Sequence, residues 1–280
     1  MHLEGLHTTS VRRITFKNKL LQKSFDENGY VVAPLLQSNQ LTALEKVYKR
    51  LDTGNSSGFH ASILHNSAEY RRNVHGQVSE LMIGAADGYL DNYRALSGQF
   101  VVKEPGKRSF LPHHLDWSFI DETNQSSVAI WCPLKDVNHE NGNLTVLEGS
   151  HNIGLTKRGF GYTHTERKVQ DFLSQRFKEV AFPLKAGESL FYDHRLIHGS
   201  PPNLSSLTRV VSLLILIPTE AQSLYYHRKS EKELEVYKTD EEFYFRYKMG
   251  EPKLRLKKLA EKTVTPNYIS LEQLSSLKKN

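Results

Sequence analysis

Between residues 100 and 217 the chain is a succession of short apolar segments separated by turn residues, and this pattern limits the fold more than any other feature. Each segment has four to eight residues rich in β-branched and aromatic side chains, and Gly, Pro or Asn follows it. Such spacing is typical of antiparallel strands in a sandwich or barrel. We expect strands at 100–103, 127–132, 144–147, 179–182, 189–192 and 210–217.

The segments on either side have helical periodicity. Apolar stripes predict helices over 20–28, which ends at Gly29, over 41–51, and from Asn66 towards Tyr89, with a short strand at 30–33. After Pro218 a mixed-charge pattern predicts helix again. The sequence therefore predicts one α+β domain over residues 1–280, with mainly helical support at 1–95, a jelly-roll core at 96–218 and a helical C-terminal extension at 219–280.

Composition excludes several classes of protein. Apolar residues make up 38% and charged residues 24%, which indicates a globular chain and not a disordered one. The single cysteine, Cys132, excludes a disulfide framework and a multi-cysteine zinc site. No apolar run reaches the roughly 20 residues of a membrane helix, and no apolar stretch follows Arg12 and Arg13 as in a signal peptide. We expect a soluble cytoplasmic protein.

The formal charge of +6 belongs to the ends of the chain. Residues 1–25 and 228–280 each carry a net +4, and residues 26–227 carry −2. A basic end can indicate nucleic-acid binding, but the C-terminal charges alternate in sign, as on solvated helices. We therefore expect no nucleic-acid or membrane partner, and an acidic carrier protein is the one macromolecular partner that the basic ends leave open.

The first candidate for chemistry is the pair His114-x-Asp116. Side chains alternate faces on an extended chain, so His114 and Asp116 share one face. Iron(II) oxygenases use two His and one carboxylate on one face of the metal and keep the other positions open. On this pair alone, a His and an Asp bonded to each other in a core is an equal alternative. Core-type residues surround the pair, namely Leu111, Leu115, Trp117 and Phe119.

A second cluster lies about 80 residues later. His198 follows the predicted strand 189–192 and precedes a Gly-Ser-Pro-Pro turn, so the end of a strand presents it. Arg209 begins the apolar strand 210–217, where a buried guanidinium is costly without an anionic partner. Its planar fork suits a carboxylate. A dicarboxylate bound to a metal at one end needs such a partner at the other.

Together these residues resemble the phytanoyl-CoA dioxygenase family of iron(II)/2-oxoglutarate-dependent oxygenases. The resemblance covers roughly residues 24–217. It includes Phe25-Asp26-Glu27-Asn28-Gly29-Tyr30-Val31-Val32, the pair His114-x-Asp116, the turn Asn141-Gly142-Asn143-Leu144 leading to Leu147-Glu148-Gly149-Ser150-His151, the segment Leu196-Ile197-His198-Gly199-Ser200, and Arg209. The order and spacing of these motifs make it specific.

The resemblance implies a double-stranded β-helix and a set of site residues. The iron ligands are expected to be His114, Asp116 and His198, with no catalytic residue beyond the metal centre. Arg209 and Ser200 are expected to bind 2-oxoglutarate, and Trp131 matches a family tryptophan near this cosubstrate. The strand before the metal pair adds two candidates for cosubstrate binding, Gln99 and Lys103. The candidate substrate residues are Trp117, Phe119 and Arg195.

The resemblance also implies a reaction. Iron(II), 2-oxoglutarate and O2 would hydroxylate an unactivated C–H bond of a small molecule and release succinate and CO2. Related halogenases have a small residue in place of Asp116, so its presence favours hydroxylation, desaturation or an oxidative rearrangement. We expect a substrate from specialised, natural-product metabolism, and a monomer or homodimer.

Two other functions stay open. A cupin-type enzyme of another class would need further metal ligands, whereas the motifs supply three and an Arg. A non-catalytic jelly-roll binding protein would be favoured by the loss of a ligand, and all three ligand types are present at His114, Asp116 and His198.

Overall fold

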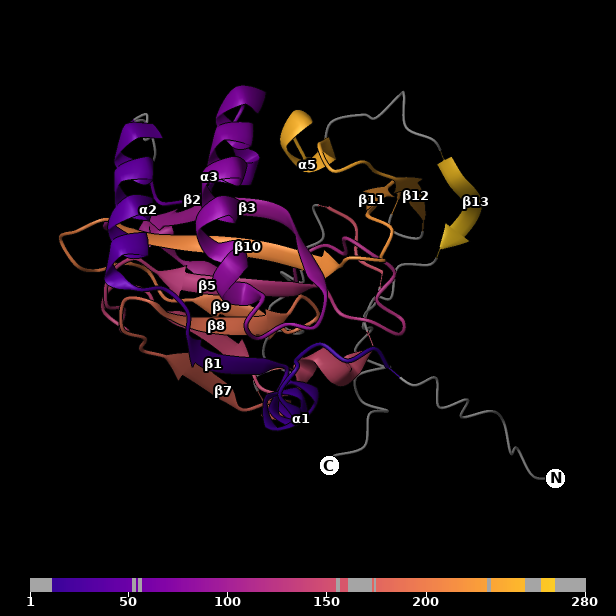
Figure 1. Cartoon of the computed structure of the whole chain (residues 1–280), viewed down its shortest axis with the longest axis horizontal. Helices are drawn as coiled ribbons and strands as arrows, with labels where there is room; N and C mark the ends of the chain where they lie inside the picture. The colour runs from indigo at the N-terminus through magenta and orange to yellow at the C-terminus, as the bar shows by residue number, and fades with distance from the viewer. Residues whose placement is uncertain are drawn as a thin grey trace.

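The computed structural model describes residues 12–51, 54, 57–154, 157–160, 173, 175–230 and 233–249, and the backbone of 258–264. Three helices come from the first third of the chain (Figure 1). They are α1 (Lys19–Asn28), α2 (Ser38–Leu51) and α3 (Ala68–Ala86), and short 3-10 turns follow at Ser62–Leu64, Lys107–Ser109 and Ser150–Ile153.

Local sequence explains where the helices begin and end. The Asn18 side chain accepts hydrogen bonds from the first backbone N–H groups of α1, and Gly29 ends this helix at φ +85°, a conformation that glycine adopts without strain. Ser67 caps α3, because its hydroxyl accepts from the Tyr70 N–H, so this helix begins at Ala68, two residues after the predicted start. The three predicted helices are therefore confirmed, with small differences at their ends.

Two antiparallel sheets form the jelly roll, and all six predicted strands of the middle region belong to them. The larger sheet has the order β1-β8-β5-β10-β3-β2 and the smaller sheet the order β4-β9-β6-β7. The larger sheet contains β1 (Tyr30–Pro34), β2 (Phe59–Ala61), β3 (Tyr93–Lys103), β5 (Val128–Pro133), β8 (Glu188–Asp193) and β10 (Arg209–Pro218). The smaller contains β4 (Leu111–His114), β6 (Leu144–Leu147), β7 (Glu179–Phe182) and β9 (His198–Ser200).

Alternation along the strands of the larger sheet separates two cores. On β10, Leu214 and Leu216 pack beneath α2 and α3, whereas Val211 and Leu213 face the smaller sheet. Trp131 on β5 also faces the smaller sheet, in the same cluster as Val211. Arg209 shares the parity of Val211 and Leu213, and its guanidinium lies over the Trp131 ring. The space between the sheets is therefore where the predicted polar residues collect.

The first third of the chain does more than support the core. Its segments β1 and β2 are the two edge strands of the larger sheet. β3 already begins at Tyr93, seven residues before the predicted strand. Among the described residues, no helix is both long enough and apolar enough to span a membrane.

The predicted helical C-terminal extension is wrong where the structure describes it. Residues 224–238 form a hairpin of β11 (Leu224–Arg228) and β12 (Leu234–Lys238), to which β13 (Lys258–Val264) adds a third strand. Only α5 (Phe243–Arg246) is helical there. Tyr225 and Phe243 pack with Phe119 and Ile217 in a third apolar cluster, and this tertiary packing outweighs the helical preference of the charged sequence. Residues 250–257 and 265–280 lie outside the described part of the chain.

One contact between α3 and the larger sheet makes stability depend on pH. Gly98 N–H donates to His75 Nδ1 over 3.0 Å, and the imidazole stacks on Phe245. A Cβ at Gly98 would lie 2.8 Å from Val78 Cβ, so helix and strand are in direct contact. Burial lowers the pKa of His75 below its ordinary value. The folded state therefore binds this proton less tightly than the unfolded chain does.

We predict that acid weakens this contact. The contribution of His75 is complete above the unfolded pKa of about 6.5 and is lost as pH falls below it. Between pH 7 and pH 5, the wild-type free energy of unfolding should fall by about 1 kcal/mol more than that of His75→Gln, which keeps an acceptor but does not titrate. Urea unfolding at the two pH values measures both losses. Equal losses in the two proteins would contradict the assignment.

Candidate metal centre

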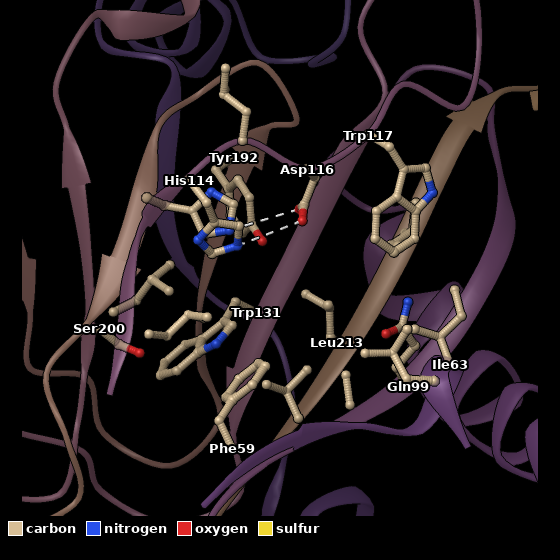
Figure 2. A pocket seen from close by; sticks show the side chains of 18 of the residues that line it. Phe59, Ile63, Gln99, His114, Asp116, Trp117, Trp131, Tyr192, Ser200 and Leu213 are labelled. Carbon is tan, nitrogen blue, oxygen red and sulfur yellow. Dashed lines mark ion pairs between the residues drawn. The ribbon is translucent and has the colours of Figure 1, made fainter. Parts of the chain in front are cut away.

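Three side chains from the smaller sheet and the loop after β4 converge on one point (Figure 2). His114 ends β4 and lies directly opposite His198 on β9. Asp116 follows two residues after His114, beyond the end of the strand. Its carboxylate oxygens lie 3.9 Å from His114 Nε2 and 3.8 Å from His198 Nε2. The three ligand atoms all lie within 4.8 Å of one another, an arrangement that could hold a metal ion.

Backbone carbonyls orient both imidazoles. His114 Nδ1 lies 2.9 Å from the Pro112 carbonyl oxygen, and His198 Nδ1 lies 3.0 Å from that of Leu196. In each ring Nδ1–H therefore donates to the main chain, and the lone pair of Nε2 points towards Asp116. Metal-binding histidines are commonly fixed in this way. Burial lowers the pKa of His198 to about 4, so this imidazole is neutral, as a metal ligand must be.

A buried ion pair holds the backbone of the loop that carries the Asp116 carboxylate. Arg158 Nε donates to the Asp116 carbonyl oxygen over 2.6 Å, and its Nη1 and Nη2 donate to the two carboxylate oxygens of Glu122 over 2.6 and 3.2 Å. Nη2 also donates to the His194 carbonyl oxygen. Glu122 accepts further hydrogen bonds from Ser127 and Ser118. The network fixes the loop on which Asp116 lies, and neither Arg158 nor Glu122 was predicted as a site residue.

A third histidine, His194, lies on the other side of the carboxylate. Its Nε2 is 3.9 Å from Asp116 Oδ2, and its ring packs edge-on against Phe119. Burial alone would raise the pKa of Asp116, but the imidazoles of His198, His194 and His114 and the charge of Arg158 hold it below its usual range. The carboxylate is therefore ionised at neutral pH.

We predict that breaking the buried pair has a large effect on stability. Arg158→Met leaves the Glu122 charge buried and unpaired, which costs about 3–5 kcal/mol. It should also weaken metal binding about 10- to 100-fold, because it releases the support behind Asp116. Urea unfolding and a metal titration measure the two effects. Lys185→Met, which breaks the exposed pair with Asp136, is the matched control and should leave stability almost unchanged.

A comparison with the double variant tests the reason for this effect. Arg158→Met combined with Glu122→Met replaces both charges by apolar side chains and should regain much of the lost stability. A double variant as unstable as the sum of the two single ones would mean that the pair stabilises by packing and not by charge.

The cavity in front of the three ligands has a volume of about 290 Å³ and continues to Arg209. The Arg209 guanidinium is 5% exposed and lies 5.4 Å above the Trp131 ring. Its Nε has no hydrogen-bond partner among the described residues. Burial lowers the pKa of Arg209 to about 9, which still leaves it charged at neutral pH. A buried cation with an unused donor is suited to bind an anion.

Most of the other predicted site residues line the same cavity. Trp131 lies under Arg209, Ser200 lies on the same side of the cavity as Trp131, and Gln99 lies beside Ile63 on the other side of Leu213 (Figure 2). The cross-strand register agrees, because Gln99 pairs with Leu213 and not with Arg209. Among the predicted substrate residues, Trp117 and Phe119 contribute to the wall.

Two predicted residues do not line the cavity. Arg195 is 6% exposed and its guanidinium binds Asp193, with Nη2 2.6 Å from Oδ2 and Nε 2.9 Å from Oδ1. The Asp193 carboxylate, two residues away, neutralises its charge. Arg195 is therefore not a substrate-binding residue. Lys103 Nζ donates to the carbonyl oxygens of Ser109, Ser200 and Pro201. This side chain fixes the turn after β9 and does not reach the cosubstrate end of the cavity.

The donor set fits an iron(II) ion and a chelating dicarboxylate. Two imidazoles and one carboxylate on a single side leave the remaining positions open towards the cavity. The separations of 3.8 and 3.9 Å are below the roughly 4.2 Å that two ligands at about 2.1 Å from one ion can span. At the other end, Arg209 offers the positive charge that a distal carboxylate requires.

Comparison with known sequences agrees with this geometry. The sequence profile of the phytanoyl-CoA dioxygenase (PhyH) family matches residues 25–211. A phytanoyl-CoA dioxygenase of Arabidopsis thaliana is 29% identical over 194 residues, which are 67% of this chain and 60% of that protein. Phytanoyl-CoA dioxygenase 1 of Oryza sativa subsp. japonica is 26% identical over 207 residues, 71% of this chain and 64% of that one. The chain thus spans less than two thirds of these relatives.

Solved structures support the fold. EctD from S. alaskensis, determined with 2-oxoglutarate and 5-hydroxyectoine, superposes with a TM-score of 0.56 at 18% identity and covers 89% of both chains. The jelly-roll architecture, with its two facing antiparallel sheets, is therefore confirmed.

Proposed function

Because the chain belongs to the phytanoyl-CoA dioxygenase family, we propose that it is an iron(II)- and 2-oxoglutarate-dependent oxygenase that hydroxylates an unactivated C–H bond of a small molecule. One observation carries this proposal. Within one cavity, His114, Asp116 and His198 face Arg209, a buried cation whose Nε has no hydrogen-bond partner among the described residues. A metal-binding protein of another class would not need a buried cation at that place.

Each residue has a defined task. His114, Asp116 and His198 would hold the ion, which with O2 as oxidant and 2-oxoglutarate as co-reductant would supply the oxidising power for the C–H bond, with release of succinate and CO2. Arg209 binds the distal carboxylate through charge-assisted hydrogen bonds. Ser200 lies near the same end and contributes its hydroxyl, while Trp131 forms the floor.

The protein also determines orientation and exclusion of water. The carbonyl groups behind His114 and His198 accept from Nδ1–H and so direct Nε2 to the ion. Arg158 holds the backbone at Asp116. The apolar wall, which includes Leu213, keeps water from the reacting C–H bond and holds the substrate in place.

Hydroxylation is favoured over halogenation because Asp116 occupies one position that a halide would need. We further propose a substrate from specialised metabolism. SnoN, described as an epimerase in complex with Fe3+, alpha ketoglutarate and nogalamycin RO, superposes with a TM-score of 0.53 at 21% identity over 73% of this chain and 85% of that one.

The predicted acidic carrier protein would bind the two basic ends of the chain, which lie partly outside the described residues.

An anaerobic titration tests the proposal. Iron(II) and then 2-oxoglutarate are added to the full chain, and we expect the weak visible charge-transfer band of the chelate. On admission of air, succinate release over a metabolite panel then identifies substrates. Absence of the band, together with unchanged iron(II) binding by Asp116→Ala, would exclude an oxygenase and leave a non-catalytic binding protein as the better explanation.

A further inference from the structure

The cavity has two ends, and 2-oxoglutarate can fill only one of them. Arg209 and Ile215 both line it, six residues apart on β10, which is about 20 Å along a strand that rises about 3.3 Å per residue. A five-carbon chain spans no more than about 6 Å at about 1.5 Å per bond. The part of the cavity around Ile215 therefore lies beyond the reach of a cosubstrate bound to Arg209, and it is the place for the substrate.

Aromatic and aliphatic side chains form this far end. Its wall includes Ile63, Trp117, Phe119, Phe160 and Ile215, which belong to one apolar cluster. The Trp117 ring packs against Phe160 with centroids 5.1 Å apart at 72°, and against Phe119 at 5.5 Å. These three rings come from two separate segments of the chain and make one rigid apolar surface. Flat, rigid surfaces of this kind pack well against a ring system.

The far end carries no charge. Among the described residues that line the cavity, the charged and metal-binding groups are Arg209, His114, Asp116 and His198, and all four are engaged by the metal and the cosubstrate. A charged group of the substrate near Ile215 would lose its hydration and gain no counter-ion. The wall therefore selects against ionic substrates.

Besides the Tyr192 hydroxyl, which belongs to a ring packed against His198, Trp117 and Gln99 offer polar groups for recognition. Trp117 Nε1 is buried and has no hydrogen-bond partner among the described residues. It can only donate, so it requires an acceptor. The Gln99 amide nitrogen donates to Ser97 Oγ over 3.3 Å, which leaves the amide oxygen for the cavity. A neutral carbonyl group can accept from the Trp117 N–H, and a hydroxyl group can in addition donate to the Gln99 oxygen.

We propose that the substrate is an uncharged, largely apolar ring compound with a carbonyl or hydroxyl group that accepts a hydrogen bond from Trp117 Nε1. This inference rests on the proposed function in assigning His114, Asp116 and His198 to the metal and Arg209 to 2-oxoglutarate. Binding of the ring compound itself requires no turnover, so it can be tested separately.

The chain offers its own reporter for the test. Its two tryptophans, Trp117 and Trp131, both line the cavity, so intrinsic fluorescence responds to occupancy there. The full chain is loaded with nickel(II) and 2-oxoglutarate and titrated with four probes of one ring size: tetralin, 2-tetralone, tetralin-2-carboxylate and protonated 2-aminotetralin. We expect 2-tetralone to bind at least tenfold more tightly than either charged probe. A charged probe that binds equally well or better would overturn the proposal.

A conservative variant tests the hydrogen bond. Trp117→Phe keeps an aromatic ring and removes the N–H, and Trp131 remains as reporter. We expect 2-tetralone to bind roughly 2- to 10-fold more weakly to this variant, whereas tetralin, which has no acceptor, should bind with unchanged affinity. Equal losses for both probes would mean that Trp117 acts by shape alone and would overturn its assigned role.

The same samples separate the two proposals. The change that 2-oxoglutarate causes in the nickel absorption spectrum reports cosubstrate binding independently of the tetralins. If 2-oxoglutarate fails to bind while 2-tetralone binds, the proposed oxygenase function fails and the substrate inference stands. If 2-oxoglutarate binds and a charged tetralin is preferred, the substrate inference alone fails.

Discussion

His114→Ala is expected to reduce metal binding at least 100-fold and to bring 2-oxoglutarate turnover to background. In the proposed centre it is one of three protein ligands among the described residues, and even residues that merely orient ligands cost about 10- to 100-fold when they are replaced. His114 is partly exposed, so its removal should change stability little. Equilibrium dialysis with iron(II) under argon, followed by a succinate assay in air, measures the two losses.

The chain offers a closely matched control at the preceding position. His113 lies on the same strand, and its side chain is 20% exposed against 19% for His114. It points to the opposite face, where Nε2 lies 3.2 Å from Thr145 Oγ1 and 3.8 Å from Glu179. His113→Ala should therefore retain metal binding and turnover within a few-fold. If the two variants lose metal equally, the loss reports damage to β4 and the ligand assignment fails.

This contrast between neighbours shows why the centre could be predicted from sequence. Alternation along an extended segment separates His113 from His114 without any knowledge of the fold. Arg209 could be predicted because a cation at the start of a buried strand requires a partner. Both arguments use features of a few adjacent residues, and such features survive folding unchanged.

The support behind the centre could not be predicted, because it depends on distant residues. Arg158 and Glu122 are 36 positions apart, and nothing local distinguishes either from a surface charge. For Arg195 the prediction was wrong in the opposite direction, because a role in substrate binding was expected of a residue that has none. It lies between the two histidine-bearing positions 194 and 198, but the nearby Asp193 carboxylate binds it.

The prediction of a helix in the C-terminal segment failed for a related reason. Alternating charges around residues 229–235 are compatible with an exposed helix and equally with an exposed strand. What decides between them is the packing of Tyr225 against Phe243, with ring centroids 5.1 Å apart. Sequence periodicity gives no information on a contact between a strand and a later helix.

The second large effect concerns binding of 2-oxoglutarate at the Arg209 end of the cavity, and two ligands can test it. Arg209→Gln should weaken binding of 2-oxoglutarate by about 100-fold, because removing one partner of a buried, hydrogen-bonded charge pair costs about 2–5 kcal/mol. Iron(II) affinity should stay unchanged, since Arg209 is not a ligand. The second ligand is 2-oxopentanoate, in which a methyl group replaces the distal carboxylate and the chelating end is identical.

Wild-type protein should prefer 2-oxoglutarate over 2-oxopentanoate by about 100-fold, and Arg209→Gln should bind the two about equally. This cycle isolates the interaction between the guanidinium and the distal carboxylate from every other effect of the substitution. Retained binding of 2-oxopentanoate also demonstrates that the variant folds and keeps its metal. If the variant still prefers 2-oxoglutarate as strongly as the wild type, the carboxylate binds elsewhere, and the buried charge of Arg209 must serve another ligand.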